Sequence, residues 1–173
     1  MSPARTARIA GAAYLGTIVF GSLALAFSGG AGTAVNLMAT ACYVVVVLLF
    51  YSLFEPVNRT ISGLAAAVGM VGCGVSALNL FDLRPVKLNT LVFFGVYCAL
   101  IAYLIGKSTF LPRFLSLMMA IAALAWLTFL WPSLARTLAP FNMLPGIIGE
   151  AVLTVWLLVK GVDERRWKEQ AGI

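Results

Sequence analysis

Long apolar runs alternate with short polar segments along the whole chain of 173 residues. A helix of about 20 residues crosses a hydrocarbon core of about 30 Å, so each run is long enough to span a bilayer. The pattern predicts an all-α, polytopic membrane protein with six transmembrane helices in one bundle, forming a single domain over residues 1–173. The predicted spans cover about residues 9–27, 35–54, 61–81, 88–105, 114–134 and 145–162.

The composition supports the membrane interpretation. Hydrophobic residues make up 62% of the chain and charged residues 10%, whereas soluble domains carry about 25% charged residues. A soluble core of this size cannot hide so much apolar surface. The bilayer is therefore the expected solvent for most side chains.

The basic residues indicate an orientation. If the N-terminus lies in the cytoplasm, nine of the twelve Lys and Arg residues fall in inner segments and three in outer loops. The inner ones are Arg5, Arg8, Arg59, Lys107, Arg113, Lys160, Arg165, Arg166 and Lys168, and the outer ones are Arg84, Lys87 and Arg136. The positive-inside rule then predicts that both termini are cytoplasmic. The tail after residue 162 is charged and contains Trp167, which is typical of a membrane-surface anchor.

Several kinds of chemistry are not expected from this sequence. Histidine is absent, and Cys42, Cys73 and Cys98 lie inside apolar runs without metal-ligand spacing, so we predict no metal site and no cofactor. Catalysis by Ser-His-Asp or Cys-His arrangements is excluded for the same reason. No basic stripe with interleaved aromatic residues is present, so nucleic acid is not an expected partner.

Glu150 is the principal candidate for a functional residue. It lies within the sixth predicted span, next to Ile148 and Ala151, and a charged residue inside a span indicates function by default. Arg136 is the nearest candidate cation in sequence, and Thr154 lies one turn further along the same face. The alternative is a purely structural hydrogen bond or ion pair between helices.

Further polar residues fall on the predicted outer side of the membrane and indicate a polar pocket there. The alternative is that Asp82 and Arg84 are solvated loop charges. The candidate binding residues are Asn79, Asp82, Arg84, Arg136, Asn142 and Glu150.

Three segments resemble a known bacterial membrane family, catalogued as domain of unknown function 4386. They are residues 8–15 (RIAGAAYL), residues 103–113 (YLIGKSTFLPR) and residues 149–161, which begin with GE and end with WLLVKG. The first outer loop, residues 28–34, looks short for the family, and Ser116 stands where glycine is more typical. The resemblance implies a six-helix protein of the bacterial cytoplasmic membrane and brings no accepted activity.

Three functions remain open from the sequence. The first is a non-enzymatic membrane protein that binds membrane lipids, a lipophilic small molecule, a membrane protein partner or a second copy of itself. The second is an intramembrane enzyme on a lipophilic substrate such as an isoprenoid, with Glu150 as general acid in an aromatic-lined site. The third is a small transporter subunit, although inverted repeats are not evident. Aromatic residues available for the second are Tyr14, Phe93, Phe94, Tyr97, Trp126, Phe129, Trp131 and Trp156.

Overall fold

The computed structural model describes residues 1–83 and 89–173, and these residues form helices joined by short connections. Six segments are long and apolar enough to cross a membrane, which confirms the predicted all-α, multi-pass architecture. The long helices are α1 (Pro3–Ala24), α2 (Gly29–Phe54), α3 (Arg59–Leu80), α4 (Thr90–Lys107), α5 (Arg113–Leu127) and α7 (Leu144–Val159). The short elements are η1 (Thr128–Leu130), α6 (Pro132–Leu138), η2 (Phe141–Met143) and α8 (Glu164–Ala171).

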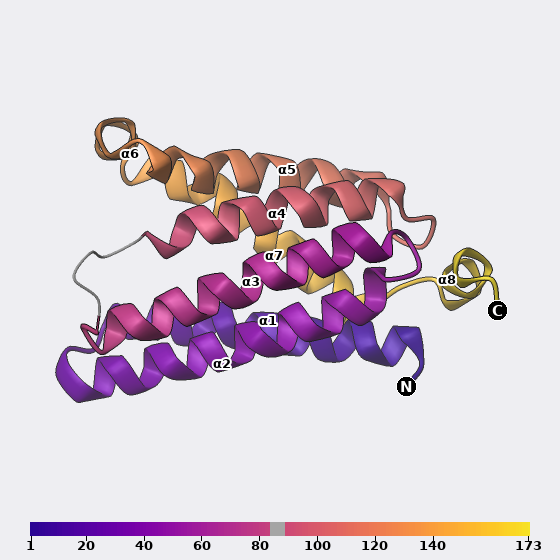
Figure 1. Ribbon diagram of the computed structural model, residues 1–173, viewed down its shortest axis with the longest axis horizontal. Coiled ribbons are helices and arrows are strands. Elements are labelled where there is room, and N and C mark those ends of the chain that lie inside the picture. Colours follow the sequence, from indigo (N-terminus) through magenta and orange to yellow (C-terminus); the bar gives the residue numbers. More distant parts are fainter. Residues whose placement is uncertain (84–88) are drawn as a thin grey trace.

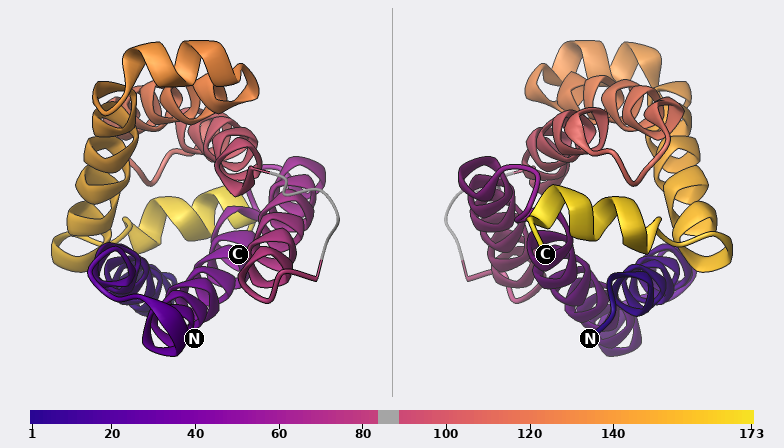
Figure 2. Two further views of the ribbon diagram at one scale, coloured as in Figure 1. Left: turned by 90° about the vertical axis from the view of Figure 1, so that its left-hand side faces the viewer. Right: turned by 90° about the vertical axis from the view of Figure 1, so that its right-hand side faces the viewer.

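The six long helices form a closed ring. Each packs against its neighbour in sequence, with α5 followed by α7, and α7 also packs against α1 to complete the ring (Figure 2). Both chain termini lie at the same end of the bundle (Figure 1). We call this end, with the α2–α3 and α4–α5 turns, the proximal end, and the opposite end the distal end.

The fifth predicted span extends further toward the C-terminus than the helix found there. The apolar pattern predicts a span to residue 134, but α5 ends at Leu127 and a single 3₁₀ turn follows. Trp131 is extended and Pro132 starts α6, because proline disfavours helical conformation in the residue before it and cannot join a continuous helical ladder. The short helix α6 therefore turns aside and lies at the distal edge of the ring, beside the end of α5 (Figure 2).

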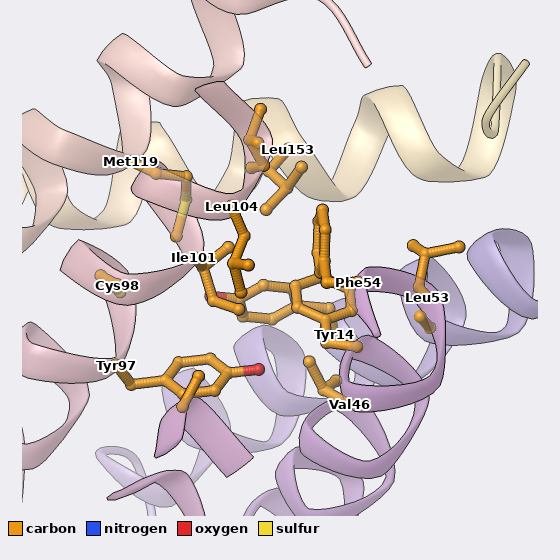
Figure 3. Close-up of a cluster of buried hydrophobic side chains, with 14 of the residues drawn as sticks. Tyr14, Val46, Leu53, Phe54, Tyr97, Cys98, Ile101, Leu104, Met119 and Leu153 are labelled. Atoms are coloured by element: carbon orange, nitrogen blue, oxygen red, sulfur yellow. The ribbon is translucent and has the colours of Figure 1, made fainter. Parts of the chain in front are cut away.

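Aromatic and aliphatic side chains fill the proximal half of the ring. Phe50 and Phe54 of α2 pack edge-to-face with ring centroids 5.6 Å apart, and Leu104 and Leu153 are fully buried beside them. Tyr14 of α1 extends into the same cluster (Figure 3). This half of the bundle is a close-packed core, in which small changes of side-chain volume affect stability.

Helix α8 closes the proximal end of the ring (Figure 2). The Trp167 indole packs against the core, and its Nε1 donates a hydrogen bond to the Leu53 carbonyl oxygen at 2.8 Å. The Gln170 side chain accepts a hydrogen bond from the Thr109 amide at 2.9 Å, which fixes α8 to the α4–α5 turn. The indole is therefore directed into the bundle, and the attachment of the charged tail to the membrane surface stays a prediction.

Replacing Trp167 by phenylalanine should destabilise the protein by about 1 kcal/mol, because a helix-terminal carbonyl of α2 loses its donor. The measurement is the thermal unfolding of the purified protein in detergent. Trp156→Phe is the matched control, since the Trp156 indole makes no hydrogen bond with the residues that the structure describes and packs on Phe114. An equal loss of stability in both variants would contradict the predicted role of the Trp167 hydrogen bond.

Candidate binding site around Glu150

Side chains from four helices meet at the carboxylate of Glu150. Trp126 of α5 donates from Nε1 to Oε1 at 2.8 Å, and the Cys98 thiol of α4 donates to the same oxygen at 3.6 Å. The Tyr14 hydroxyl of α1 lies within electrostatic reach of the carboxylate but outside hydrogen-bond geometry. The sequence segments that hold these residues are far apart, and only the closed ring brings them together.

Two glycines of α7 position this cluster by letting α5 approach closely. A Cβ atom at Gly146 would overlap the Trp126 indole, and one at Gly149 would lie 2.6 Å from the Met118 carbonyl oxygen. Small residues permit such contacts between helix backbones in lipid. The close approach places the indole N–H at the Glu150 carboxylate.

A cavity of about 350 Å³ lies in the distal half of the ring, and Glu150 is part of its wall. Tyr43, Phe94 and Trp126 supply aromatic surface to the same wall. Smaller polar side chains line it as well, namely Thr17, Ser22, Asn36, Thr40 and Ser76. Glu150 is the only charged residue among the described residues that line the cavity.

Buried tyrosine hydroxyls border the cavity and the Glu150 cluster. Tyr43 is 4% exposed, Tyr97 is 1% exposed and Tyr14 is fully buried. None of their hydroxyl groups makes a hydrogen bond with a described residue, although the rings contact one another, with the Tyr14 and Tyr43 centroids 5.8 Å apart. A buried hydroxyl without a partner costs free energy, so this arrangement needs an explanation beyond packing.

The predicted partners of Glu150 lie elsewhere. Arg136 is exposed on α6 and forms no ion pair with Glu150. Thr154 does donate to Glu150, but to its backbone oxygen at 2.7 Å and not to the carboxylate. Within the described part of the chain, Glu150 therefore has hydrogen-bond donors but no cation beside it.

The other candidate residues are not brought to the cavity. The Asn142 side chain is buried and donates to the Thr128 hydroxyl at 3.1 Å, which ties η2 to η1. Asn79 lies near the end of α3 and Asp82 is exposed just after it, and neither lines the cavity. Arg84, and Lys87 beside it in sequence, fall outside the described residues.

Sequence reasoning identified some of the aromatic residues but missed most of the polar members of the site, including Thr17, Ser22, Asn36 and Thr40. Phe94 and Trp126 were among the expected aromatic residues, and both line the cavity. Tyr43 and Cys98 were missed as polar members of the site. The sequence does contain a feature that singles out Tyr43: its hydroxyl is a polar group directly before four valines in the second span.

The family model described as domain of unknown function (DUF4386) matches residues 86–161, which confirms the predicted resemblance over this segment. The matched segment carries Cys98, Trp126 and Glu150, whereas Tyr14 and Tyr43 precede it. Comparison with curated proteins gave no match, and neither did comparison with solved structures. The chain is thus a multi-pass membrane protein with family similarity in its second half.

Proposed function

We propose that the protein binds a lipophilic molecule within the bilayer, in the distal cavity of its helix ring, without changing it chemically. The observation that carries the proposal is the cavity itself: about 350 Å³, walled by apolar and aromatic side chains, with Glu150 and several smaller polar side chains among them. Ligand sites commonly have volumes of about 300–1,000 Å³ and this mixture of apolar walls and placed polar groups.

The organisation of the ring supports binding at the distal end. The proximal half is filled by core side chains and closed by α8, whereas the described cavity walls belong to the distal halves of the helices. An apolar ligand can reach such a site from the lipid without crossing the packed core. The positive-inside pattern supports an orientation in which this end faces away from the cytoplasm of a bacterium.

The enzyme alternative rests on the same carboxyl group. As a general acid, Glu150 would have to carry a proton and donate it to the substrate. Both described hydrogen bonds to the Glu150 side chain end on Oε1 and hold the carboxyl group in place. No second charged residue lines the cavity among the described residues, so no further acid or base of that kind is at hand, and we therefore favour binding over turnover.

Filling the cavity should abolish binding. Gly21 lines it, and a Cβ atom there meets nothing within 4 Å, so Gly21→Phe adds a large ring without a backbone clash. Native mass spectrometry of the protein from mild detergent should show a bound lipophile at fixed stoichiometry, reduced at least about tenfold in Gly21→Phe, which corresponds to about 1.4 kcal/mol.

Gly74→Phe is the matched control for this experiment. Gly74 is exposed on α3, does not line the cavity, and is also open around its Cβ position. Equal lipophile occupancy in both variants would contradict the proposed site. Recovery of a converted product in place of an unchanged ligand would favour the enzyme alternative.

A further inference from the structure

Resting on the proposed binding function, the geometry points to a specific class of ligand: we propose that the cavity binds a lipophilic ammonium compound, with Glu150 as the counter-ion and Tyr43, Phe94 and Trp126 as the aromatic wall around its cationic group. The apolar chain of such a compound would occupy the remaining cavity toward the distal end.

The described residues of the site carry a negative charge without a counter-charge. Glu150 is the only charged side chain among the described residues that line the cavity, and no described Lys or Arg pairs with it. A buried charge without a partner is costly, so charged residues in membrane spans normally pair or serve a ligand. A cationic ligand supplies the missing charge, whereas an anionic head group such as a phosphate or a fatty-acid carboxylate would be repelled.

The carboxylate also has acceptor capacity left. The Trp126 indole and the Cys98 thiol both donate to Oε1. Neither of these two hydrogen bonds uses Oε2, and the Tyr14 hydroxyl near the carboxylate lies outside hydrogen-bond geometry. These donors fix the orientation of the carboxylate and leave one oxygen for an ammonium group.

The aromatic residues match a cation better than a neutral group. The Tyr43 and Phe94 rings pack with centroids 4.6 Å apart, and both line the cavity together with Trp126. Aromatic faces attract ammonium groups through their quadrupole, and this attraction strengthens when water is excluded. The unpartnered Tyr43 hydroxyl, on a side chain only 4% exposed, adds a polar oxygen at the same wall.

Two photoreactive probes test the inference. Both carry the same benzophenone-tagged dodecyl chain; one ends in trimethylammonium and the other in a hydroxyl group. Labelling is carried out on the full chain in an uncharged maltoside detergent, and the modified peptides are mapped by mass spectrometry. We expect cavity peptides to be labelled at about tenfold lower concentration by the ammonium probe, as an ion pair with cation–π contacts predicts. Glu150→Gln should remove this difference.

The neutral probe is the internal control for folding. Glu150→Gln should still be labelled by the hydroxyl probe, whereas Gly21→Phe should lose labelling by both probes. If Glu150→Gln is labelled by neither probe, a competition experiment on the wild-type protein tests the inference instead. Unlabelled dodecyltrimethylammonium should then displace the ammonium probe about tenfold more effectively than dodecanol does.

The remaining outcomes separate the two proposals. Equal labelling of cavity peptides by both probes, blocked by Gly21→Phe, would overturn the ammonium inference and leave the lipophile-binding function intact. If neither probe labels cavity peptides in a way that Gly21→Phe prevents, both the ammonium inference and the lipophile-binding function are overturned.

Discussion

Replacing Gly149 by alanine should destabilise the protein by about 1–3 kcal/mol, the usual range for overpacking a close helix contact. The added Cβ would lie 2.6 Å from the Met118 carbonyl oxygen and 3.0 Å from the Ala122 Cβ. A backbone oxygen cannot move aside as a side chain can, so α7 and α5 must separate. The melting temperature of the detergent-purified protein, followed by circular dichroism, measures this loss.

The same separation should disturb the site. Trp126 and Glu150 lie on the two helices that are forced apart, and their hydrogen bond is only 2.8 Å long. The matched control is Gly74→Ala on α3, where a Cβ meets nothing within 4 Å and alanine favours the helix over glycine. A Gly149→Ala protein as stable as this control would show that α5 and α7 are not in close contact.

The number of spans was predictable because the bilayer imposes a simple requirement. Each crossing must be a helix of about 20 apolar residues, since backbone groups cannot remain unpaired in lipid. The ends of the helices were less predictable. Hydropathy alone carried the fifth span to residue 134, whereas Pro132 and the extended Trp131 end it earlier.

The cavity could not be predicted because lipid-facing and core-facing residues are equally apolar in such a chain. Leu48 of α2 is 53% exposed while Val47 beside it is fully buried, and nothing in their chemistry distinguishes the two. Glu150 was predictable because it is charged within a span. Its partners were not: Trp126 and Cys98 lie 24 and 52 residues away in sequence, and their meeting depends on how the ring closes.

The direction in which the cavity opens depends on orientation, which labelling of single cysteines tests. The nine basic residues of the predicted inner segments belong to the proximal end, together with both termini (Figure 1). Ser133 is exposed on α6 at the distal end, and Lys168 is exposed on α8 at the proximal end. In a variant with Cys42, Cys73 and Cys98 replaced, Ser133→Cys should react with a membrane-impermeant maleimide on intact bacterial cells. Lys168→Cys should react only after permeabilisation.

This all-or-none difference follows from the positive-inside rule, which keeps short basic segments in the cytoplasm. Denatured protein is the control, because both cysteines should then react equally. The reverse labelling pattern would place the termini outside and the distal cavity at the cytoplasmic face, so that its ligand would be drawn from the inner leaflet. The expected pattern instead makes the outer leaflet the source of the ligand, with the α8-closed proximal end facing the cytoplasm.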